Sequence, residues 1–117
     1  MASSSKALSV RFFRTKSGRE PVREWLKACS AADRKALGEG IRTVQLGCPL
    51  GMPVVRKLEP DLWEIRVHLT DRIVRIVFTI LEEDVVLLHA FTKKSQRTPR
   101  DDLSLARQRR DLVLGNS

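Results

Sequence analysis

Two arginines stand where they could bind one phosphate group together. Arg66 and Arg75 belong to consecutive runs in which apolar and polar residues alternate, as they do in half-buried strands. Each arginine lies on the polar face of its run, and cross-strand neighbours on one face come within about 5 to 8 Å. Two like charges so close need something negative beside them. That partner could be Glu64, on the same face, or it could be a phosphate.

A basic segment follows the last strand-like run and adds to this charge. Residues 92–97 read Thr-Lys-Lys-Ser-Gln-Arg, so Lys93, Lys94 and Arg97 bring three more cations to one end of the sheet. A guanidinium binds phosphate oxygens as a bidentate fork, and an ammonium group binds them as a point charge. Together with the two strand arginines, the segment predicts a phosphate-binding cluster.

His89 is the residue type best suited to exchange protons near neutral pH. It alternates with Leu87 and Phe91 on its run, so a buried structural histidine is an equally open interpretation. Phe91 could stack on a nucleobase or pack in the core. Cys29 and Cys48 lack the spacing of a zinc site, and no cofactor motif is present, so we expect neither metal nor cofactor.

The periodicity predicts the elements that must position these residues. In order they are a strand at 8–14, helices at 21–29 and 30–44, a loop at 47–53, strands at 62–69, 72–80 and 84–92, and a helix at 99–113. Thr98 is the expected N-cap of the last helix. The predicted fold is an α+β two-layer domain, in which a largely antiparallel four-stranded sheet packs on two N-terminal helices, with a C-terminal helix added. Residues 1–7 would be a flexible lead-in, 8–113 the single domain and 114–117 a tail.

The chain is short and basic. It has 117 residues, with 22 Lys and Arg against 14 Asp and Glu, and 42% of its residues are hydrophobic. This hydrophobic content excludes a disordered basic tail. The excess charge is concentrated at residues 1–27 and 93–110, each with seven basic and two acidic residues. A polyanion is therefore the first partner to consider. With no apolar run long enough for a membrane span and no signal peptide, we expect a cytoplasmic protein.

Four segments in a fixed order carry a resemblance to a known family. They are Arg56-Lys57-Leu58, Leu62-Trp63-Glu64-Ile65-Arg66, Val74-Arg75-Ile76-Val77-Phe78 and residues 87–99. The series resembles the RelE/HigB superfamily of bacterial toxins, and within it the HigB-like branch that is also described as phage-derived. The resemblance spans residues 8–112.

The resemblance implies a toxin that cleaves mRNA in the ribosomal A site without a metal. The ribose 2′-OH would attack the adjacent phosphate, which requires a base, cations for the phosphorane and an acid for the leaving oxygen. Matching along the chain gives Arg66, Arg75 and Lys93 or Lys94 the catalytic basic positions. The chain contains no tyrosine, so the family's tyrosine is missing, and the base would be His89, Lys93 or Lys57.

The resemblance also implies partners. These are the ribosome, its mRNA and a helix-turn-helix antitoxin similar to HigA. The residues expected to contact RNA or the ribosome are Arg56, Lys57, Arg97, Arg107 and Arg110, although the last two could simply form the solvated face of their helix. Two alternatives stay open: a non-catalytic module that only grips RNA or joins a repressor complex, such as a decayed toxin, and a scaffold whose charge serves solubility.

Overall fold

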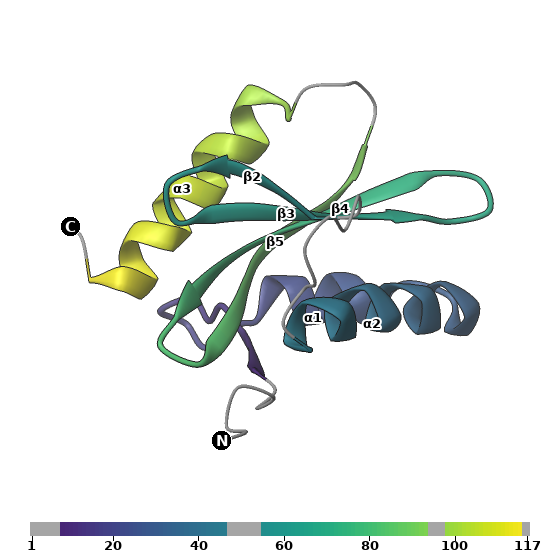
Figure 1. The fold of residues 1–117 in the computed structure, drawn as a ribbon, viewed down its shortest axis with the longest axis horizontal. Coiled ribbons are helices and arrows are strands. Elements are labelled where there is room, and N and C mark those ends of the chain that lie inside the picture. Colours follow the sequence, from purple (N-terminus) through teal and green to yellow (C-terminus); the bar gives the residue numbers. More distant parts are fainter. Residues whose placement is uncertain (1–7, 47–54, 94–97, 116–117) are drawn as a thin grey trace, which may run out of the picture.

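The structure is a computed structural model that describes residues 8–46, 55–93 and 98–115, apart from the side chain of Lys93. Five strands and three helices occur in these residues (Figure 1). In chain order they are β1 (Ser9–Phe12), α1 (Pro21–Lys27), α2 (Ala31–Gln45), β2 (Val55–Glu59), β3 (Leu62–His68), β4 (Ile73–Leu81), β5 (Asp84–Lys93) and α3 (Arg100–Leu114). The predicted loop at 47–53 lies outside the described residues.

The strands form one mixed sheet in the order β1-β5-β4-β3-β2. β1 runs parallel to β5, and the other pairs are antiparallel. The predicted four-stranded sheet is therefore one strand short, because the sequence pattern does not predict β2. β2 is a short edge strand in which Arg56 and Lys57 are both exposed, and its register shifts between Lys57 and Glu59. An exposed strand with a bulge shows no alternation of apolar and polar residues.

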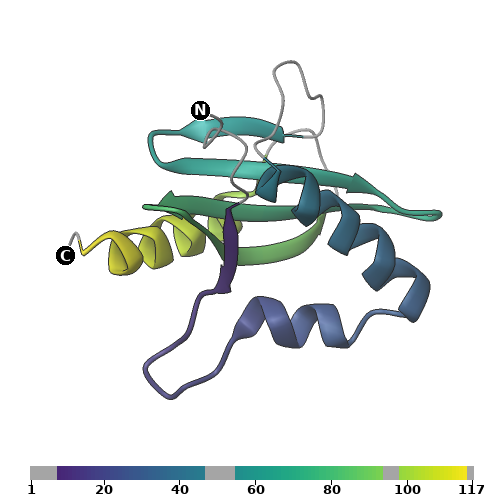
Figure 2. The same ribbon diagram turned by 60° about the horizontal axis from the view of Figure 1, so that its bottom comes forward.

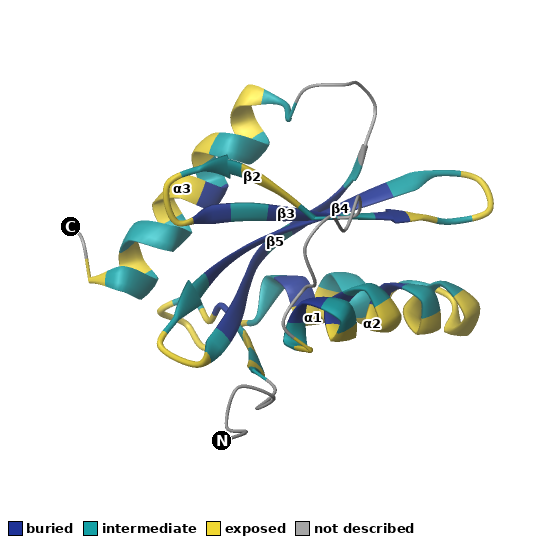
Figure 3. Ribbon diagram, viewed as in Figure 1, coloured by how far each residue is buried: buried dark blue, intermediate teal, exposed yellow. Residues whose placement is uncertain are grey.

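The sheet is covered on both faces. α1 and α2 follow one another along one face, and α3 crosses the other (Figure 1, Figure 2). Ile76 and Phe78 of β4 pack toward α1 and α2, whereas Val77 packs with Ala106 of α3. The predicted two-layer arrangement is therefore wrong, since α3 adds a third layer. β3, β4 and β5 consequently carry most of the buried residues of the sheet, as Figure 3 shows.

The helices follow the capping and periodicity signals with one exception. The side chain of Ser30 accepts a hydrogen bond from the Asp33 backbone N–H at 3.2 Å and caps α2, as predicted. α3 begins one residue later than expected, with Pro99 at the N-cap, and the hydroxyl of Thr98 binds elsewhere. No described helix is long and apolar enough to cross a membrane.

We predict that glycine-to-alanine substitutions in α2 have opposite effects at two positions. A Cβ at Gly40 would lie 2.8 Å from a methyl carbon of Val67 in β3, whereas a Cβ at Gly38 would meet nothing within 4 Å. Val67 is buried and β-branched, so it cannot easily move aside. Gly38→Ala should stabilise the chain by about 0.5 to 1 kcal/mol, and Gly40→Ala should destabilise it by about 1 kcal/mol or more. Urea unfolding measures both, and equal stabilisation by both would contradict the close packing of α2 on β3.

Candidate active site

A buried ion pair occupies the face of the sheet that α3 covers. Arg75 of β4 and Glu64 of β3 both have side chains that are 0% exposed, and Arg75 Nη1 donates to Glu64 Oε2 at 3.1 Å. The hydroxyl of Thr98 accepts a hydrogen bond from Arg75 Nη1 at 3.0 Å and donates one to Glu64 Oε2 at 3.2 Å. Thr98 directly precedes the N-cap of α3, so this network ties the start of α3 to the middle of the sheet.

The negative partner of Arg75 is thus Glu64, one of the two possibilities that the sequence left open. Arg75 also lies beneath the surface instead of projecting from it. Burial is the main cause that lowers the pKa of Arg75, and the positive charges of Arg66 and Arg56 lower it further, while Glu64 opposes them. An arginine remains protonated despite such a shift. Arg75 therefore contributes a fixed positive charge from below the surface.

Arg66 and Arg56 lie near the buried Arg75–Glu64 pair and are more exposed than either of its members. Arg66 lies directly opposite Arg75 in the β3–β4 register, and Arg56 lies opposite Glu64 in the β2–β3 register. Arg66 is half-buried and Arg56 is exposed. Within the part of the chain that the structure describes, neither forms an ion pair. Three guanidinium groups from three adjacent strands therefore face one carboxylate, which leaves positive charge available to an anion.

His89 completes the site from β5. A register shift between Val77 and Phe78 turns Leu88 and His89 both toward α3. His89 Nε2 lies 2.6 Å from Asp102 Oδ1 in the first turn of α3, and the two side chains are 16% and 27% exposed. The ring also stacks on Phe91, with 5.4 Å between the centroids. His89 is therefore neither fully buried nor free, because a carboxylate and an aromatic ring fix its orientation.

The histidine is also open to a cavity. This cavity of about 150 Å³ lies between α1, β5 and α3, and Trp25, His89 and Arg109 are among its lining residues. Asp102 is not among the site residues that the sequence predicts. Its only signal was an acidic residue in the first turn of a helix, which helix capping explains equally well. Nothing local in the sequence places that turn beside His89.

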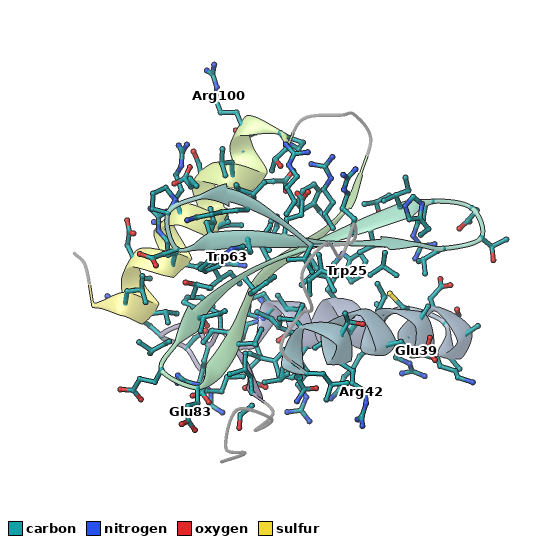
Figure 4. All side chains as sticks on the ribbon, in the orientation of Figure 1. Trp25, Glu39, Arg42, Trp63, Glu83 and Arg100 are labelled. Carbon is teal, nitrogen blue, oxygen red and sulfur yellow. The ribbon has the colours of Figure 1, made fainter. Side chains whose placement is uncertain are left out.

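The strand register places the arginine cluster and His89 close together, in neighbouring rows of cross-strand partners. Glu64 lies opposite Val77, and Val77 lies opposite His89; in the next row, Arg66, Arg75 and Phe91 lie opposite one another. Strands lie about 4.8 Å apart, so the Cα atoms of Arg66 and His89 are separated by about 12 Å. Figure 4 shows that Arg100, at the start of α3, points away from the sheet, so we do not count it among the site residues.

Other predicted site residues lie elsewhere. Lys57 Nζ lies 5.8 Å from the ring centroid of Trp63, on the face of the sheet that packs toward α1 and α2. Lys57 is therefore on the opposite face from Arg66. The backbone of Lys93 pairs with Ile73 at the end of β5. The side chain of Lys93, and Lys94 and Arg97 entirely, lie outside the described residues.

Arg107 and Arg110 of α3 hold the turn between β2 and β3. Arg107 Nη2 lies 2.9 Å from Glu59 Oε1, and Arg110 Nη1 lies 2.7 Å from Glu59 Oε2. Their side chains are 48% and 16% exposed. Hydrogen bonds from Arg107 and then Arg110, against the opposing effect of burial, hold the pKa of Glu59 below its ordinary value of 4.5. Contact of these arginines with the ribosome stays a prediction, but part of their charge is already used within the fold.

Comparison with known families assigns the chain. A family model described as phage-derived protein Gp49-like matches residues 24–111, from α1 to α3, and so includes every described site residue. The chain belongs to the Gp49-like family. This family is part of the RelE/HigB-like toxins, so the resemblance seen in the sequence is confirmed at that level. A comparison with curated proteins found no matching sequence.

We predict that the stability of this Gp49-like chain depends on the charge of Glu64 but not on that of Arg66. Glu64→Gln removes the carboxylate that neutralises a fully buried guanidinium, which should lower the free energy of unfolding by about 3 kcal/mol. Arg66→Gln is the control. It removes a repulsive charge at the surface and should change stability by less than about 0.5 kcal/mol. Urea unfolding at neutral pH measures the free energy of unfolding of both variants. A decrease of less than about 1 kcal/mol for Glu64→Gln would refute a structural role of the Arg75–Glu64 pair.

The Glu59 cluster predicts a pH-dependent contribution to stability. Because the pKa of Glu59 is lowered in the folded chain, its contribution is complete above the unfolded pKa and is lost as the pH falls through the folded one. Glu59→Gln should therefore cost about 1 kcal/mol at pH 7 and almost nothing once the carboxyl is protonated. Glu39→Gln, at an exposed position on α2, is the matched control. A Glu59→Gln effect that is the same at both pH values contradicts the assignment.

Proposed function

We propose that this chain is the toxin of a toxin–antitoxin pair, belongs to the HigB-like branch and cleaves mRNA on the ribosome. The observation that carries the proposal is the pairing of two features on one sheet face. Arg66 is a half-buried guanidinium with no carboxylate partner among the described residues, and His89 is held by Asp102 in the neighbouring row. Arg66 is suited to binding a phosphate, and the His89–Asp102 pair is suited to proton transfer. Membership of a toxin family supports the idea that the two act together in RNA cleavage.

Arg66 and Arg56 would bind the reacting phosphate. Arg75 would not touch it, because its side chain is 0% exposed; it would instead add a fixed positive charge from beneath. Guanidinium groups that already have their final positions stabilise the extra charge of a phosphorane without reorganising. The buried network of Arg75, Glu64 and Thr98 keeps β3, β4 and the start of α3 in register, and so fixes the position of Arg66.

His89 would act as the base. If its Nε2–H donates to Asp102, the lone pair is on Nδ1, which can accept the proton of the ribose 2′-OH. The 2′ oxygen then bonds to phosphorus, and the bond from phosphorus to the 5′ oxygen breaks. The products are a 2′,3′-cyclic phosphate and a 5′-OH. The ammonium group of Lys93 or Lys94 would act as the acid that donates a proton to the leaving 5′ oxygen. No metal is required in this scheme, because the cations are side chains.

The remaining parts of the proposal concern partners and place of action. The ribosome would present the mRNA to the sheet face that carries Arg66 and His89. A helix-turn-helix antitoxin similar to HigA would silence the toxin, and both would act in the cytoplasm, where ribosomes are found. Arg97, Arg107 and Arg110 keep their proposed contacts with ribosomal RNA.

A non-catalytic module is the second candidate, and two observations favour it. Arg75 is neutralised by Glu64 within the fold, and the chain has no tyrosine. A site with these departures could still grip RNA phosphates through Arg66 and Arg56 while cleaving nothing. Binding would then weaken as the salt concentration rises, because phosphate contacts release counterions.

We predict that Arg66→Ala and His89→Ala each lower mRNA cleavage by about 100-fold in a cell-free translation reaction. Primer extension on the translated mRNA would reveal the new 5′ ends. Arg42→Ala is the matched control, because Arg42 is an exposed arginine that points away from the sheet on α2 (Figure 4). Cleavage that persists undiminished in Arg66→Ala would overturn the role of that residue. If the unaltered chain cleaves nothing but binds ribosomes in a salt-dependent manner, the non-catalytic module is correct.

A further inference from the structure

The cavity beside His89 lies where β5 extends beyond β1. β1 pairs with β5 only as far as Leu87, whereas β5 continues to Lys93. His89 and Ala90 therefore lie on an edge of the sheet with which no described strand pairs on that side. The two residues face opposite ways, His89 toward α3 and Ala90 toward α1, and both line the cavity. Groups from both faces of the sheet thus meet in one cavity of about 150 Å³.

The wall of the cavity is apolar on the side of α1 and polar on the side of α3. Pro21, Val22 and Trp25 of α1 line it. Trp25 is half-buried and points from α1 toward the sheet (Figure 4). Arg109 of α3 and the ring of His89 supply the polar groups. A mostly apolar pocket with a few polar groups is typical of a site for a small organic molecule, so this wall suits an organic ring better than a bare phosphate.

Arg109 is a half-buried cation that is held in place without a carboxylate. Its Nη1 donates to Leu88 O at 2.8 Å, and its guanidinium carbon lies 5.3 Å from the ring centroid of Phe13. Burial lowers the pKa of Arg109, and no described residue forms an ion pair with it. Its Nε and Nη2 groups have no acceptor among the described residues. These two groups form a fork that can bind two acceptor atoms of a ligand.

A nucleobase combines the features that this cavity requires. A volume of about 150 Å³ holds one aromatic ring, so a base can enter while its ribose and phosphate stay outside. Bases stack on aromatic side chains, and Trp25 offers one. Guanine presents two neighbouring acceptors, O6 and N7, to a guanidinium fork, whereas adenine presents an amino donor in place of O6. The fork of Arg109 therefore favours guanine, which would enter with the edge that carries these two acceptors.

We propose that the cavity between Trp25 and Arg109 binds a guanine base of the RNA that the chain cleaves. The position of this guanine in the RNA rests on the proposed function, in which His89 takes the proton of the ribose 2′-OH. His89 lines the same cavity, and the carbon that bears the 2′-OH is bonded to the carbon that bears the base. The guanine therefore belongs to the nucleotide on the 5′ side of the cleaved bond. Trp25 and Arg109 determine specificity and take no part in breaking the bond.

Binding of nucleoside 3′-monophosphates tests the cavity without any cleavage. The full chain is titrated with the guanosine, adenosine, cytidine and uridine forms, and with ribose 3-phosphate, which has no base. NMR chemical shifts give the affinities. The guanosine form should bind about tenfold more tightly than the other three, and ribose 3-phosphate more weakly than all of them. The indole N–H signal of Trp25 should shift, whereas that of Trp63, which does not line the cavity, should stay in place.

Two matched pairs of substitutions test the location. Arg109→Lys keeps the charge but loses the fork, so the preference for the guanosine form should fall to less than about threefold. Arg100→Lys, at an exposed position on the same helix, is its control and should keep the preference. Trp25→Leu removes the stacking surface and should weaken binding of the guanosine form by about tenfold. Trp63→Leu, at another half-buried tryptophan, is its control, and circular dichroism verifies that all four variants fold.

The outcomes separate this inference from the proposed function. Equal affinity for the four monophosphates, or for ribose 3-phosphate and the guanosine form, would overturn the guanine site. mRNA cleavage that persists in that case would leave the proposed function intact. Guanine-selective binding that depends on Arg109, in a chain that cleaves no mRNA, would establish the site and overturn the proposed function. If both hold, primer extension should show cuts mainly after guanosine, and Arg109→Lys should spread them over other nucleotides.

Discussion

A guanidinium and a carboxylate that both lose all contact with water constrain the rest of this fold. Taking two such charges out of water costs several kcal/mol for each ion, and only close pairing and further hydrogen bonds offset that loss. Arg75 and Glu64 meet this requirement with the hydroxyl of Thr98. The register of β3 against β4 and the start of α3 are therefore coupled. The bonds that Arg75 Nη1 and the Thr98 hydroxyl donate to this carboxylate both involve Oε2, and Glu64 Oε1 has no hydrogen-bond partner among the described residues, so part of the cost of burying the carboxylate is not offset.

The same constraint separates two arginines that look alike in the sequence. Arg66 and Arg75 occupy equivalent polar positions on neighbouring strands, and alternation correctly placed both on the face opposite α1 and α2. Alternation reports the face of a residue but not what covers that face. Thr98 and α3 cover Arg75 and leave Arg66 half open. The coverage depends on contacts between residues more than 20 positions apart, and no local pattern encodes it.

Local signals predicted the helices and the central strands well, because each has a strong apolar period. They failed at β2, where packing against β3 imposes a strand on an exposed segment. They also missed Asp102, which becomes a site residue only because α3 lies across β5 and meets His89. Thr98 is a second residue whose role the local pattern does not predict. Its position before α3 is typical of a helix N-cap, but its hydroxyl donates to the buried carboxylate of Glu64 instead.

The excess positive charge of the chain is consequently not one uniform surface. Arg75 is neutralised inside the fold, and Arg107 and Arg110 hold Glu59. Arg66 and Arg56 remain open on one face, while Arg14 and Lys16 line the edge beside β1. A polyanion that spreads over the whole molecule would use all of these cations alike. Because the fold has already paired some of them and left others open, the phosphate that we propose as ligand would be bound by Arg66 and Arg56 on the sheet face and not by the basic surface as a whole.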